Sequence, residues 1–80
     1  RYEIHAKKSG KVVLIDNQAI NEICMNLGAP HEKIAGLHFH IDYGEKVKKG
    51  DKLFTLYAKT EDRLNLGLKA LENYQVVVIK

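Results

Sequence analysis

The chain has 80 residues, of which 45% are hydrophobic and 29% charged, an ordinary globular mixture that argues against disorder. Its longest uncharged apolar run covers only residues 76–79, whereas a membrane span needs about 20 such residues, so no membrane partner is expected. The net charge is only +3, and only Arg1 and Arg63 offer the guanidinium that favours phosphate and base recognition, so nucleic-acid binding is not expected either.

A chain of this length can form one small domain with a single core, so residues 1–80 are expected to be a single domain. The sequence starts at Arg1, without Met or a signal peptide, and runs directly into a strand-like segment, which we interpret as a fragment cut from a longer chain. The single cysteine, Cys24, excludes an internal disulfide and a CxxC metal site, and it favours a cytoplasmic location.

The first residues predict a β-hairpin. Residues 2–6 alternate between apolar and polar, Ser9-Gly10 is typical of a turn, and residues 11–15 are rich in β-branched side chains. We therefore expect the two strands to pair across the turn.

A helix over about residues 17–27 has the clearest signals in the chain. Asp16 or Asn17 can cap its first turn, Gly28 suits the left-handed position after its last turn, and Pro30 prevents continuation. Apolar side chains at helical spacing form a stripe that we expect to pack onto the sheet: Ile20, Ile23, Cys24 and Leu27.

The middle of the chain predicts a loop over residues 29–36, a strand over 37–41 and a strand over 53–58. Between these strands, residues 45–49 form a short polar segment in which Val47 points inward.

The last part predicts a second helix and a final strand over residues 74–79. Thr60 can cap this helix and Asn73 can end it, while Gly67 costs it about 1 kcal/mol relative to Ala. Its buried stripe is expected to be Leu64, Leu68 and Leu71. The order β-β-α-β-β-α-β predicts an α+β domain with a mainly antiparallel sheet and two helices.

Two histidines provide the first candidate for a metal site. His38 and His40 are two residues apart, so they point from the same face of a strand, and His31 or His5 could complete a ligand set. No Asp, Glu or Cys stands at a spacing that fixes a third ligand. A solvated or interface-facing pair is the favoured interpretation, and no metal ligand is expected.

Catalytic and phosphate-binding residues are not expected either. Ser9 is the only serine and lies in a turn that supplies neither a base nor an oxyanion hole, and Cys24 lies on the apolar stripe of the first helix, as a small core residue would. The isolated glycines match no phosphate-binding motif. Four lysines crowd one polar segment, either as a solvated edge protected from aggregation or as a surface for an acidic partner: Lys46, Lys48, Lys49 and Lys52.

The segment 44–53 contains Val-x-x-Gly-Asp-x-Leu and resembles biotinyl and lipoyl carrier domains, as does Ser9-Gly10-Lys11-Val12. Carriers present their modified lysine at a hairpin tip between methionines or similar residues. The corresponding residues 56–60, which include Lys59, lack methionine and run into a helix. A carrier module is therefore the alternative interpretation.

A more extensive resemblance is to the C-terminal domain of pyrimidine nucleoside phosphorylases, a family that includes thymidine phosphorylase and archaeal-type AMP phosphorylases. It is carried, in order, by residues 6–12, 15–17, 27–30, 35–37, 47–51 and 56–58. Asp16-Asn17 and Gly28-Ala29-Pro30 favour the archaeal-type branch.

The resemblance implies a barrel-sandwich hybrid-like domain that is a non-catalytic accessory to the catalytic domains of its own parent chain, which is expected to be a homo-oligomer. The parent reaction would be reversible phosphorolysis of thymidine, a related nucleoside or AMP to a base and a sugar 1-phosphate. Phosphate would be a co-substrate, and no cofactor is implied. No catalytic role transfers to any residue of this chain.

Overall fold

The computed structural model describes residues 1–29, 31 and 34–80. Within them the chain forms an α+β domain, as expected, and neither helix is both long and apolar enough to cross a membrane. The elements are β1 (Tyr2–His5), β2 (Gly10–Ile15), α1 (Asn17–Leu27), β3 (Gly36–Phe39), β4 (Lys46–Val47), β5 (Lys52–Tyr57), α2 (Glu61–Leu71) and β6 (Val77–Ile79). The predicted order is confirmed, with the short strand β4 added inside the polar segment.

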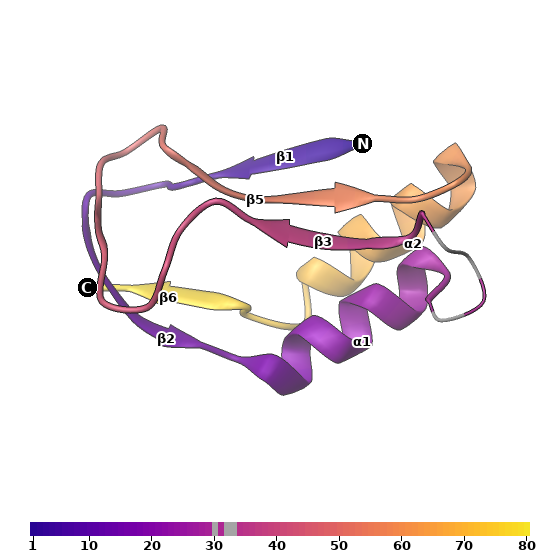
Figure 1. Ribbon diagram of the computed structural model, residues 1–80, viewed down its shortest axis with the longest axis horizontal. Coiled ribbons are helices and arrows are strands. Elements are labelled where there is room, and N and C mark those ends of the chain that lie inside the picture. Colours follow the sequence, from indigo (N-terminus) through magenta and orange to yellow (C-terminus); the bar gives the residue numbers. More distant parts are fainter. Residues whose placement is uncertain (30, 32–33) are drawn as a thin grey trace.

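The strands form two antiparallel three-stranded sheets, ordered β1-β5-β3 and β4-β2-β6. The two helices lie beside each other at one end of the molecule, and the loops that join the strands gather at the other end (Figure 1). The barrel-sandwich description stays a prediction.

The predicted hairpin is wrong, because β1 pairs with β5 and β2 pairs with β4 and β6. Residues 6–9 carry the chain from one sheet to the other. Ala6 donates its N–H to the carbonyl of Asp51 at 2.8 Å and accepts from Gly50 N–H at 2.9 Å. The Ser9 hydroxyl accepts a hydrogen bond from the N–H of Lys49 at 3.0 Å. Distant residues 49–51 therefore satisfy the backbone that a hairpin would have paired locally.

Helix α1 begins and ends where the sequence predicts. The Asp16 side chain accepts hydrogen bonds from the N–H groups of Gln18 and Ala19 at 2.9 and 3.1 Å, and Gly28 closes the helix at φ 121°. The predicted role of Pro30 lies outside the described residues. Ile23 and Leu27 are fully buried, but the expected packing on the sheet is only partly right, because α1 packs mainly against α2 and less extensively against β3.

Helix α2 is capped by Thr60, whose hydroxyl accepts a hydrogen bond from Arg63 N–H at 3.2 Å. Its last residue is Leu71, and Glu72 rather than Asn73 caps it. The predicted leucine stripe is half-buried, whereas the buried residues of the helix are Gly67 and Ala70. The face of α2 that is buried in the domain is therefore formed by small residues.

Strand β5 is the centre of the core. It lies between β1 and β3, and four consecutive residues, 53–56, are buried on both faces of the sheet. Phe54 packs on Phe39 of β3 with ring centroids 5.6 Å apart, and Val47 is buried as predicted. The remaining buried apolar residues are Ala6, Val12, Ala19, Ile23, Leu27, Ile41, Leu53, Leu56, Ala70, Val76 and Ile79.

Candidate docking groove

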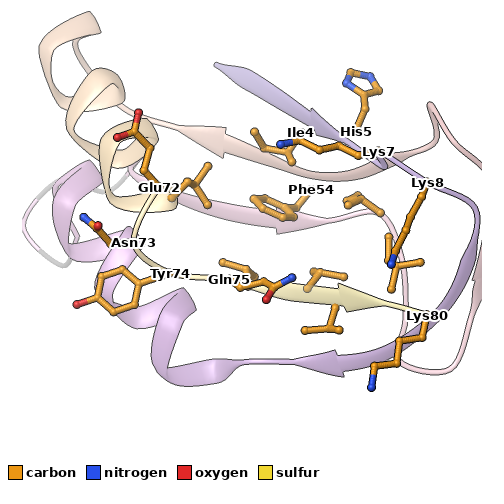
Figure 2. Close-up of a pocket in the computed structure, with 16 residues that line it drawn as sticks. Ile4, His5, Lys7, Lys8, Phe54, Glu72, Asn73, Tyr74, Gln75 and Lys80 are labelled. Atoms are coloured by element: carbon orange, nitrogen blue, oxygen red, sulfur yellow. The ribbon is translucent and has the colours of Figure 1, made fainter.

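A groove of about 710 Å³ lies between the two sheets, with β1 and β5 on one side and β6 and the residues before it on the other (Figure 2). Strand β1 is the edge of one sheet, β6 is the edge of the other, and the two do not pair with each other. The sheets are therefore open along this side. Half of the sixteen lining residues are apolar: Ile4, Leu53, Phe54, Leu71, Val76, Val77, Val78 and Ile79.

The two ends of the groove differ in charge. Figure 2 shows Lys7, Lys8 and Lys80 leaving the chain at one end, with the Lys7 side chain reaching back toward Ile4 and the Lys80 side chain pointing past β2, and it shows Glu72 with Tyr74 at the other end. All three lysines are exposed, and in the described part of the chain the one ion pair joins Glu3 to Lys52 at 3.0 Å. The three lysines that line this apolar groove thus have no acidic partner among the described residues.

The borders of the groove are also backbone edges. An edge strand presents N–H and C=O groups that can pair with a further extended segment. Residues 71–80, which include β6, line the groove without a break. This combination suits the binding of an extended polypeptide.

The histidines do not assemble into a metal centre. His38 and His40 are both exposed, as predicted, and their rings lie edge to face with centroids 5.1 Å apart. His40 Nε2 and Thr55 Oγ1 are hydrogen-bonded at 2.7 Å, which satisfies the one buried polar residue of the described core. No group of three His, Cys, Asp or Glu among the described residues could hold a metal ion, and neither His5 nor His31 completes one.

Ser9 and Cys24 have the environments of structural residues. The hydroxyl of Ser9 is engaged with the backbone of Lys49, which ties residues 6–9 to the turn after β4. Cys24 is half-buried, and this burial raises the pKa of its thiol, which disfavours the reactive thiolate. The prediction that no residue of this chain is catalytic is untested and stays a prediction.

The lysine cluster of the polar segment is larger than the sequence suggested. Lys46 of β4 lies directly opposite Lys11 of β2, and the backbone of Lys11 exchanges hydrogen bonds with that of Lys80 at 2.8 and 3.0 Å. The cluster at 46–52 and the lysines at the basic end of the groove therefore share one end of the molecule. Lys52 differs from the other lysines of the cluster, because its ammonium group forms an ion pair with Glu3.

Sequence reasoning missed the groove. The apolar run 76–79 beside Lys80, and the pair Lys7-Lys8 before the second strand, were the available signals. These two sequence features indicate a groove only when the order of the strands is known, because that order shows that β1 and β6 are both edge strands.

The comparisons with known proteins agree with the resemblance seen in the sequence. Residues 11–77 match the family model described as the pyrimidine nucleoside phosphorylase C-terminal domain. An AMP phosphorylase of Pyrococcus abyssi is 53% identical over 67 residues, covering 84% of this chain and 13% of that protein. An AMP phosphorylase of Pyrococcus furiosus is 40% identical over 79 residues, which cover 99% of this chain and 16% of that protein. A putative thymidine phosphorylase of Legionella pneumophila is 38% identical over 78 residues, which cover 98% of this chain and 15% of that protein.

The chain thus spans between 13% and 16% of the length of these relatives. The family match includes most of the segment that resembles carrier domains, and Lys59 lies between β5 and α2 rather than between two strands. The carrier alternative is therefore not favoured.

Proposed function

We propose that this chain, which belongs to the family of pyrimidine nucleoside phosphorylase C-terminal domains, is the non-catalytic accessory domain of a phosphorylase and sets the packing of the catalytic domains in its parent protein. The observation that carries the proposal is the match over residues 11–77, together with a described surface that offers a docking groove.

The parent reaction is phosphorolysis. An oxygen of inorganic phosphate attacks the anomeric carbon of the sugar, the bond from that carbon to the base nitrogen breaks, and its electron pair leaves with the base, which takes up a proton. The products are a free base and a sugar 1-phosphate. Such a reaction needs cations that hold phosphate and groups that stabilise the leaving base, and those belong to the parent's catalytic domains.

The preferred substrate of the parent is AMP. The relatives from two Pyrococcus species bear the name AMP phosphorylase and are 53% and 40% identical, while the relative named for thymidine is 38% identical. Phosphate is the co-substrate and no further cofactor is required. We place the parent in the cytoplasm, in keeping with the single unpaired cysteine of this domain. The homo-oligomeric state is what the family resemblance implies for the parent.

The test is a comparison of the full-length protein with a version that lacks residues 2–80. Loss of the domain should lower thermal stability, change the oligomeric size or lower turnover, because a misplacement of about 1 Å can cost about a hundredfold in rate. The preference for AMP over thymidine should persist, since the reacting groups remain.

Two outcomes contradict the proposal. If size, melting temperature and turnover were all unchanged by the deletion, the architectural role would be wrong. If residues 1–80 alone converted AMP or thymidine with phosphate, the non-catalytic role would be wrong.

A further inference from the structure

We infer that the groove between β1 and β6 binds an extended, acidic segment of the remaining polypeptide of the same protein, laid alongside residues 74–80. This inference rests on the proposed function, because it identifies how the accessory domain is held on the catalytic part. Three features of the groove carry it: the apolar lining, the charge at one end and the free backbone edge.

The apolar lining favours an occupant with apolar side chains. Ile4 and Val78 are only half-buried although both belong to the lining, and Gln75 is exposed at its middle. Covering apolar surface contributes roughly 25 cal/mol per Å² removed from water, so an inserted apolar side chain is stabilised here. The continuous run 74–80 offers about 20 Å of extended chain for an occupant to follow.

The charge of the lysines that line the groove favours acidic residues in the occupant. Lys7, Lys8 and Lys80 all line the groove, Lys7 with its side chain reaching toward Ile4, and none has an ion-pair partner among the described residues (Figure 2). No carboxylate of the described residues lies within ion-pair distance of these three lysines. Carboxylates on the occupant would supply the missing charge.

The free edge determines the conformation of the occupant. Strand β6 pairs only with β2, so its other edge can accept an added strand. A segment of the same polypeptide is favoured over a separate peptide, because tethering gives an effective concentration in the millimolar range. More than four-fifths of each compared relative lies outside the part that this chain matches, which leaves ample polypeptide to provide the segment.

Photo-crosslinking in the full-length protein tests the inference. The crosslinking amino acid p-benzoylphenylalanine replaces Gln75 in the groove, and a matched control replaces Gln18, which is exposed on α1. The expected result is a crosslink from position 75, but not from position 18, to a single segment of the catalytic part that carries acidic residues. Mixing ¹⁴N- and ¹⁵N-labelled protein separates crosslinks within one chain from those between chains.

Charge reversal tests the basic end. Changing Lys7, Lys8 and Lys80 together to Glu should lower the crosslink yield at position 75 at least tenfold. The matched variant changes Lys46, Lys48 and Lys49 to Glu and should keep the yield, because these lysines share the same end of the molecule but do not line the groove. Thermal melting of both variants confirms that they are folded.

The outcomes separate this inference from the proposed function. If deletion of the domain lowers turnover but position 75 forms no crosslink, or crosslinks only a second copy or copurified RNA, the groove assignment is wrong and the accessory role stands. Equal yields from the two triple variants would also overturn it. If deletion changes nothing measurable, the accessory role itself is wrong.

Discussion

Gly67 of α2 lies directly against Leu27 of α1. A Cβ atom placed on Gly67 would be 2.8 Å from Leu27 Cγ, closer than real Cβ atoms come to a neighbouring carbon, and Leu27 is fully buried. We expect Gly67→Ala to destabilise the domain by about 1–2 kcal/mol, because overpacking outweighs the roughly 1 kcal/mol that Ala gains in helix propensity. Chemical denaturation measures the change.

A second variant separates the clash from other effects. In the background Leu27→Ala the neighbouring side chain is gone, so Gly67→Ala should become neutral or stabilising. A cost of the same size in both backgrounds would show that the contact with Leu27 is not the cause.

Ile23 tests the core of α1. Its side chain is fully buried, and α1 packs chiefly against α2. We expect Ile23→Ala to cost roughly 2–4 kcal/mol in unfolding free energy, as large-to-small core substitutions do. Met25 on the same helix is 62% exposed, so Met25→Ala is the matched control and should change stability by less than about 0.5 kcal/mol.

The sequence predicted the local elements better than their partners. The capping by Asp16 and Gly28 and the inward position of Val47 depend on residues close in the chain, and the structure confirms them. The pairing of β1 with β5 joins residues about 50 apart in the sequence, and no local pattern specifies it. Hence a hairpin was expected where the chain changes sheets.

The packing role of Gly67 could not be predicted from the sequence for the same reason. In the sequence it is a weak point in a helical pattern, and only the packing of α2 on α1 shows that a small residue is needed there. The same contrast holds for the candidate site. The exposure of the histidine pair was predicted correctly from the alternation of the strand. The groove could not be predicted, because it depends on two strand edges that only the assembled sheets define.

The exposed ion pair between Glu3 and Lys52 predicts a pH effect. The hydrogen bond from Lys52 holds the pKa of Glu3 below its ordinary value of 4.5. Burial opposes this shift, and the charges of Lys52, Arg1 and His5 act in the same direction as the hydrogen bond. A lowered folded pKa stabilises the fold above pH 4.5, and this stabilisation is lost as the pH falls through the folded pKa.

In Lys52→Met the pKa of Glu3 should therefore move back up toward 4.5, and a smaller part of the stability should depend on pH in this acidic range. NMR titration of the Glu3 side-chain carboxyl measures the shift. Lys69→Met on α2 is the control and should leave the titration of Glu3 where it is. An unchanged pKa in Lys52→Met would contradict the assigned cause.

Lys59 should carry no biotin or lipoyl group. It lies between the end of β5 and the start of α2 and lacks flanking methionines, whereas a carrier lysine projects from the tip of a hairpin. Intact mass after co-expression with a biotin or lipoate ligase should equal that of the unmodified chain. An added biotin or lipoyl mass at Lys59 would restore the carrier interpretation.

The last prediction concerns two like charges that face each other. Lys11 of β2 and Lys46 of β4 are register partners, and both are exposed. Directly opposed like charges destabilise a strand pair, whereas opposite charges contribute roughly 0.2–1 kcal/mol. We therefore expect Lys46→Glu to raise the unfolding free energy by about 0.5 kcal/mol, and Lys11→Glu to do the same.

A double-mutant cycle provides the decisive comparison. The variant with both Lys11→Glu and Lys46→Glu places two carboxylates opposite each other, so it should lose the gain that each single change gives. Lys49→Glu changes the net charge equally but has no strand partner, and it should have a smaller effect. The gain should also shrink at 1 M salt, where screening acts within about 3 Å. Additive gains in the double variant would mean that overall charge, rather than the pairing of Lys11 with Lys46, controls the stability of this edge.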